Sequence, residues 1–186
     1  GDEVIAQAKT IRSIPLRLRG NAPDVLEIRG EIFMPNTSFD AINSQREEDG
    51  DPLFANARNA TAGTLKSLDP SIVASRKLAF LAHGRGEVVW DDAPTTWSQF
   101  ADALRAFGIP VSDQLQCCTG IDEIEKVVAV FATKRLSLNY GVDGMVIRVD
   151  AFSQQDELGS TSKSPRWCIA FKYPAERGET ILTQVD

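Results

Sequence analysis

The sequence predicts an α+β fold of antiparallel sheets with flanking helices. Segments with the two-residue alternation of strands and segments with helical periodicity both occur, but they follow one another without a regular strand–helix–strand rhythm. The chain has 186 residues, of which 42% are hydrophobic and 25% charged, as is ordinary for one globular domain with a real core. A doubly wound parallel fold is therefore disfavoured.

The first half of the chain alternates between the two periodicities. The predicted elements are a helix over 1–12, a strand over 25–34, a helix over 37–48 capped by Asn36, a helix over 58–68 and a strand pair or one long bent strand over 77–89. The helix over 58–68 is rich in small residues, which suits close approach to another backbone, whether protein or DNA. His83, the single histidine, is expected to be structural rather than catalytic.

The strand over 25–34 has one apolar and one charged face. The apolar face is formed by Leu26, Ile28, Ile32 and Met34, and the charged face by Glu27, Arg29 and Glu31. A carboxylate on the charged face can accept hydrogen bonds from sugar hydroxyls or an adenine amino group, although a cross-strand ion pair is preferred for Glu27. Gly30 is expected to admit a ligand or a neighbouring backbone close to the strand.

The second half continues in the same irregular order. The predicted elements are a capped helix over 96–107, a strand over 111–118, a helix over 121–134, a strand within 140–150, a short helix over 152–158, a strand within 164–176 and the start of a strand over 180–185. The two strands within 140–150 and 164–176 each carry one cation, Arg148 and Lys172, among small or apolar residues. They either line a pocket for an anion or are half-buried strands whose charges reach solvent.

Composition excludes several classes of protein. No apolar run has membrane length, and the acidic start is unlike a signal peptide, so a cytoplasmic protein is expected. The three cysteines form neither a disulfide framework nor a Cys-x-x-Cys metal site. The net charge of −6 argues against a strong free-standing nucleic-acid binder. A local basic face remains an alternative, and its candidate residues are Arg12, Arg17, Arg19, Arg58 and Lys66.

Four stretches in collinear order resemble motifs of the NAD-dependent bacterial DNA ligases. Residues 27–33 resemble the third nucleotidyl-transfer motif, residues 140–150 the fourth and residues 164–176 the fifth. Residues 56–70 resemble a block typical of NAD-dependent rather than ATP-dependent ligases, which argues against an ATP-dependent ligase or an RNA-capping relative. The resemblance implies a nucleotidyltransferase core of twisted antiparallel sheets, with the nucleotide in the groove between them.

The resemblance also implies a reaction and its participants. In this family a lysine attacks NAD and retains AMP, the AMP passes to the 5′-phosphate of nicked duplex DNA, and the nick is then sealed, with Mg²⁺ in the full-length enzyme. Glu31 matches the acid that contacts bound adenosine, Lys172 the lysine at the phosphate, and Asp143 an acid of metal and phosphate chemistry. Arg58 and Arg135 match basic positions of nick sealing and of DNA or nucleotide contact. The family's four-cysteine zinc module is expected beyond residue 186, so no zinc is expected in this chain, and no residue is assigned as a metal ligand.

The sequence departs from the family at three points. Arg148, at a nucleotide-binding position, replaces the usual lysine, and Lys66, at a DNA- or nucleotide-contact position, replaces the usual arginine. The Lys-x-Asp-Gly motif of the nucleophile does not occur, because Glu47 and Gly141 precede the two Asp-Gly pairs. We therefore expect residues 1–186 to be part of an adenylation domain downstream of that motif, as the abrupt start in a helix also suggests, and unable to adenylate itself. The alternative is a non-catalytic nucleotide- or DNA-binding module derived from a ligase.

Overall fold

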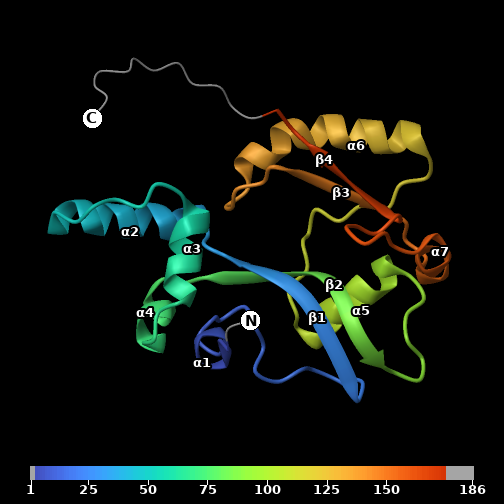
Figure 1. The fold of residues 1–186 in the computed structure, drawn as a ribbon, viewed down its shortest axis with the longest axis horizontal. Coiled ribbons are helices and arrows are strands. Elements are labelled where there is room, and N and C mark those ends of the chain that lie inside the picture. Colours follow the sequence, from blue (N-terminus) through green and yellow to red (C-terminus); the bar gives the residue numbers. More distant parts are fainter. Residues whose placement is uncertain (1–2, 175–186) are drawn as a thin grey trace.

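Two small antiparallel sheets form the centre of the molecule. The structure is a computed structural model that describes residues 3–174. In the first sheet, β1 (Val25–Phe33) pairs with β2 (Ala79–Val89), and in the second, β3 (Gly144–Arg148) pairs with β4 (Cys168–Lys172) (Figure 1). The predicted α+β class with antiparallel sheets is confirmed.

Helices flank both sheets. They are α1 (Ile5–Ala8), α2 (Asn36–Asp49), α3 (Ala57–Leu65), α4 (Pro70–Ser75), α5 (Trp97–Phe107), α6 (Ile121–Lys134), a 3₁₀ turn (Arg135–Ser137) and α7 (Phe152–Leu158). Figure 1 shows α6 alongside β3 and β4, and α5 beside β1 and β2, with α2, α3 and α4 gathered at the end of the molecule far from α7.

The β1–β2 pair is a single long, irregular ladder. Its register runs from Val25 opposite Val89 to Phe33 opposite Ala79, with two irregularities along β1. The prediction of one bent strand over 77–89 is thus the correct alternative. A Cβ atom at Gly30 would overlap the Phe80 ring and lie 2.6 Å from the Leu81 carbonyl oxygen, so the neighbours that Gly30 admits are a backbone and an aromatic ring.

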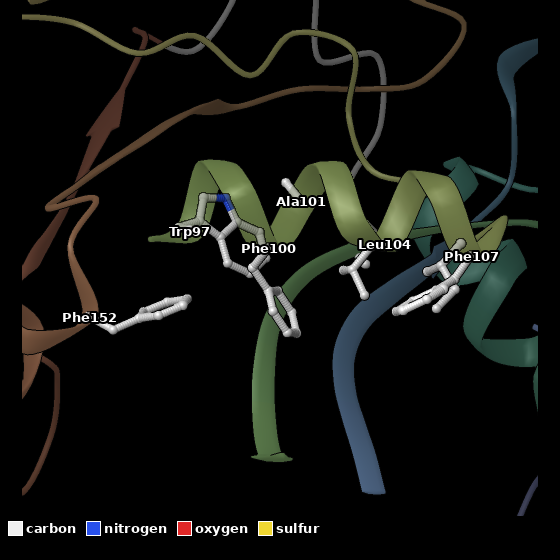
Figure 2. Packing of buried hydrophobic residues seen from close by; sticks show 8 residues of the cluster. Trp97, Phe100, Ala101, Leu104, Phe107 and Phe152 are labelled. Atoms are coloured by element: carbon white, nitrogen blue, oxygen red, sulfur yellow. The ribbon is translucent and has the colours of Figure 1, made fainter. Parts of the chain in front are cut away.

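Two hydrophobic clusters hold the elements together. The larger one is built on the apolar face of α5 and reaches β2 and α7; its buried members are Ala82, Trp97, Phe100, Ala101, Leu104, Phe107, Ile109 and Phe152 (Figure 2). The smaller one lies under α3 and α4 and contains Ile11, Met34, Ala60, Val73 and Leu78. Phe80, on β2, packs against both clusters, so the first sheet connects them.

Several local predictions differ from the structure. The helix predicted over 1–12 is limited to α1, because after Lys9 the backbone hydrogen bonds of Thr10 and Ile11 reach back only three residues and the chain continues as turns. Residues 111–118 are not a strand, because only Val111 makes a bridge, to Ala82, and the rest is loop. Helix α4 was not predicted, although Asp69 caps it by accepting from Ser71 N at 2.8 Å. Asn36 does not cap α2; it is the first helical residue, and its side chain donates to the Leu138 carbonyl oxygen. The strand predicted over 180–185 lies outside the described residues.

Gly144 allows β3 and β4 to approach closely. It lies opposite Lys172, and an added Cβ would overlap the Phe171 carbonyl oxygen and lie 3.0 Å from Lys172 Cα. Gly144→Ala is therefore expected to destabilise the chain by about 1–3 kcal/mol through overpacking, measured by thermal or urea unfolding. At Gly141 a Cβ would have no neighbour within 4 Å, so Gly141→Ala is the matched control. Equal stability of the two variants would contradict this account of Gly144.

Candidate functional site

A groove of about 1430 Å³ runs between the two sheets. Strands β1 and β2 and the start of α5 contribute to its lining, as do β3, α6 and the end of β4, and α3 adds part of its helical face. Five of the seven predicted site residues line this groove: Glu31, Arg58, Asp143, Arg148 and Lys172. The fold thus brings together residues that are more than a hundred positions apart in the sequence.

Lys172 and Asp143 form an exposed pair at one end of β3 and β4. Their side chains are 71% and 83% exposed, and Lys172 Nζ lies 3.9 Å from Asp143 Oδ2. The pairing of Gly144 with Lys172 and the hydrogen bond from Tyr173 N to the Asp143 carbonyl oxygen, 3.0 Å, fix the two backbones side by side. Because an exposed ion pair contributes little free energy, Lys172 can exchange Asp143 for a phosphate at low cost.

Arg148 lies on the same face of the second sheet as Lys172, but at the other end of β3. Its backbone lies opposite Cys168, four residues from the Gly144–Lys172 pair, which is about 14 Å along the sheet. The two cations therefore line different parts of the groove. Arg148 Nη2 donates to the His83 carbonyl oxygen at 2.9 Å, and its guanidinium carbon lies 4.4 Å from the centroid of the Trp97 ring. Burial lowers the pKa of Arg148 from its ordinary value.

The charged face of β1 borders the groove at Glu31, which is exposed and lies opposite Leu81. Glu27 does not form the preferred cross-strand ion pair. Its ionic partner is Arg29 on the same strand, at 3.6 Å, and its contact across the sheet is a hydrogen bond accepted from Glu87 N at 3.0 Å. Glu27 and Glu31, on the same face of β1, therefore differ: Glu27 is engaged by Arg29 and Glu87 N, whereas Glu31 lines the groove, where a ligand can reach it.

The cations predicted to contact DNA or nucleotide occupy different environments. Arg58 is exposed in the first turn of α3, on the groove. Lys66 is exposed at the end of that helix and does not line the groove. Arg135 donates from Nη1 to the Val142 carbonyl oxygen at 3.1 Å, and its guanidinium carbon lies 5.2 Å from the Tyr173 ring centroid. In this structure Arg135 supports the segment that leads to Asp143 rather than facing the groove.

Sequence reasoning missed several contacts in and behind the groove wall. Trp97, at the start of the helix predicted over 96–107, is only 4% exposed and belongs to the core, yet its ring also lies beneath Arg148. The Asp150 carboxylate accepts from Ser98 N at 2.8 Å and from Ser98 Oγ at 2.7 Å, which joins β3 to the start of α5. Tyr173 donates to the Val128 carbonyl oxygen at 2.6 Å and so joins β4 to α6. No sequence spacing signals these contacts, because each connects elements that meet only in the folded chain.

Residues 3–174 lack two features that would indicate other classes of protein. They contain no group of three or more His, Cys, Asp or Glu side chains arranged to hold a metal ion. No described helix is both long enough and apolar enough to cross a membrane.

Comparison with known proteins gives one consistent result. The model of the NAD-dependent DNA ligase adenylation domain family matches residues 1–176. The chain is 48% identical over 189 residues to a DNA ligase of Porphyromonas gingivalis, 45% over 188 residues to one of Akkermansia muciniphila and 43% over 187 residues to one of Alcanivorax borkumensis. Each match covers 100% of this chain but only 28%, 23% and 24% of the respective relative. The chain thus spans about a quarter of the length of these curated relatives, and it belongs to the NAD-dependent DNA ligase adenylation domain family.

Proposed function

We propose that this chain is part of an NAD-dependent DNA ligase that seals nicks in duplex DNA, and that it forms much of the nucleotide-binding groove of the adenylation domain. The observation that carries the proposal is the set of side chains on one groove: Glu31 on β1, Asp143 beside β3 and Lys172 on β4. The reaction passes through enzyme-bound AMP and DNA-adenylate. Because it closes nicks in DNA, it serves DNA replication and repair. Its compartment is the cytoplasm, where bacterial DNA lies.

The groove offers the chemistry that nucleotidyl transfer needs. Such transfers depend mainly on positioning and on neutralising the charge of the phosphate. The Lys172 ammonium, with three donors and an exposed position, binds and neutralises the phosphate of the nucleotide. Glu31 accepts hydrogen bonds from adenosine, and Arg58 contacts phosphates of the nicked DNA from the start of α3.

Asp143 fits the Mg²⁺ requirement that the family implies. Mg²⁺ is commonly held by one or two carboxylates together with substrate phosphates rather than by a cage of protein ligands. An exposed carboxylate in the groove matches this pattern, and residues 3–174 hold no larger cluster of metal-binding side chains. When bound, the ion would add positive charge at the reacting phosphate, beside the charge that Lys172 already places there.

The nucleophile is assigned to residues outside this chain. The isolated 186-residue chain, incubated with NAD labelled in its AMP half and with Mg²⁺, is expected to remain unlabelled because it has no Lys-x-Asp-Gly motif. The full-length ligase that carries this segment is expected to become labelled on a lysine. Denaturing electrophoresis followed by peptide mapping makes the measurement.

The two proteins together separate the candidate functions. Stable label on a lysine of the isolated chain would contradict the assignment of the nucleophile. A full-length protein that takes up no label but still binds AMP or DNA would instead be the binding module, the second candidate, which the missing Lys-x-Asp-Gly motif favours.

A further inference from the structure

We propose that Trp97 is a positioning residue for Arg148. The guanidinium group of Arg148 stacks on the indole ring, and the ring holds this group in the groove wall, where the guanidinium binds the anionic part of the nucleotide. This inference rests on the proposed function of the groove. It assigns to a core tryptophan of α5 a role in substrate binding that acts through a neighbouring side chain.

The first observation is the stacking geometry. The guanidinium carbon of Arg148 lies 4.4 Å from the centroid of the Trp97 ring and 5.9 Å from that of Trp167, both within the range of a cation–π contact. Figure 2 shows Trp97 in the first turn of α5, at the end of the row of core side chains that lies nearest Phe152. The core thus fixes the indole ring, which in turn limits where the guanidinium can lie.

The second observation is that Arg148 keeps unused hydrogen-bonding capacity. A guanidinium has five N–H donors. Within residues 3–174, its one hydrogen-bond acceptor is the His83 carbonyl oxygen, and no carboxylate lies within ion-pair distance. Asp150, the acid whose charge bears on Arg148, is already hydrogen bonded to Ser98 N and Oγ. The group is therefore anchored on one side and available to a ligand on the other.

The third observation is that the charge is partly removed from water. Burial lowers the pKa of Arg148, although the group remains a cation at any physiological pH. A half-buried cation without an ionic partner gains more from an approaching phosphate than an exposed one does, because the local dielectric screens less. Because Arg148 lies in the groove wall, a ligand bound in the groove can provide this electrostatic stabilisation.

Stacking also explains why arginine stands at a position where the family usually has lysine. The flat guanidinium can lie on the face of an indole ring while directing its N–H groups sideways to acceptors. A lysine ammonium is a compact, strongly hydrated point charge that cannot use the ring in the same way. Arg148→Lys is therefore expected to weaken nucleotide binding in this chain, and the weakening depends on Trp97.

A double-mutant cycle in the full-length ligase tests the pair. The four proteins are the wild type, Trp97→Leu, Arg148→Lys and the double variant, and the readouts are the half-saturating NAD concentration and the maximal rate of lysine adenylation in single turnovers. Trp97→Leu alone is expected to raise the half-saturating concentration about fivefold to tenfold, the scale of one cation–π contact. In the Arg148→Lys background the same change is expected to have less than about a twofold effect.

Trp90 provides the matched control. It also packs against the larger cluster, with its ring 5.4 Å from that of Phe107, but it neither lines the groove nor stacks on Arg148. Trp90→Leu is expected to lower the melting temperature without changing the half-saturating NAD concentration. If Trp97→Leu does not fold, the comparison of Trp97→Phe with Trp90→Phe takes its place, since phenylalanine keeps a weaker cation–π contact at position 97.

The outcomes separate this inference from the function on which it rests. Two outcomes would overturn the inference and leave Trp97 as a core residue only. In the first, the two tryptophan variants have equal effects on the half-saturating NAD concentration. In the second, Trp97→Leu has the same effect whether position 148 is arginine or lysine. A wild-type protein that does not adenylate would overturn the proposed function and the inference with it. Coupling confined to the Trp97–Arg148 pair supports the inference.

Discussion

Replacing Lys172 by alanine in the full-length ligase is expected to slow nucleotidyl transfer by about 10²–10³-fold, the usual loss when one preorganised charge-stabilising group is removed. The ammonium group lies on the groove, is 71% exposed and has the Asp143 carboxylate 3.9 Å away. Arg148 cannot replace it, because that side chain starts about 14 Å away along the sheet and already contacts His83 and Trp97.

The same change is expected to leave stability almost unaltered. An exposed pair such as Lys172–Asp143 contributes about 0–1 kcal/mol, so the Lys172→Ala enzyme should melt close to the wild type. Single-turnover rates of lysine adenylation, AMP transfer to DNA and nick sealing make the measurement. Lys163→Ala is the control, because Lys163 is equally a lysine of the surface but lies in a loop away from the groove. Wild-type rates in all three steps would make Lys172 a solvated strand residue.

The sequence was sufficient to predict an element where capping residues occur at both of its ends. The helix predicted over 96–107 forms as α5, because the Thr96 side chain accepts from Gln99 N and Gly108 ends it with a φ of 88°. The alternation in β1 likewise identified which side chains face the core and which, including Glu31, face outward. A strand over 111–118 could not be judged in this way, because β-propensity depends on a partner that these residues, Val111 apart, do not have.

The residues of the candidate site were predictable in part, but its geometry was not. Ordered motifs identified Glu31, Asp143 and Lys172, and the fold places all three on one groove. Their spacing in the sequence could not show that Arg148 stands at the far end of the sheet from Lys172. Nor could it show that Arg135 supports the segment before Asp143. The first fact depends on the register of β3 and β4, and the second on the turn that brings Arg135 to the Val142 carbonyl oxygen.

Phe100→Ala is expected to cost about 3–5 kcal/mol of unfolding free energy, the usual cost of truncating a fully buried phenylalanine. Phe100 is 1% exposed, and its ring lies 5.8 Å from that of Trp97 and 6.2 Å from that of Phe152. The cavity would therefore open between α5, the first sheet and the start of α7. For a chain of this size the loss corresponds to a fall of about 6–20 °C in melting temperature, measured by calorimetry or circular dichroism.

The cavity left by Phe100→Ala is also expected to affect the groove, because Phe100 packs behind the first turn of α5. That turn carries Trp97, beneath Arg148, and Ser98, which binds the Asp150 carboxylate. Loss of the Phe100 ring is thus expected to weaken nucleotide binding even at temperatures where the protein remains folded. Phe171→Ala, at a phenylalanine that is 40% exposed on β4, is the control for stability and should cost less than about 1.5 kcal/mol, since much of that ring already contacts water. Similar melting temperatures for the two variants would show that the α5 cluster is not the core that holds α5 and α7 against the first sheet.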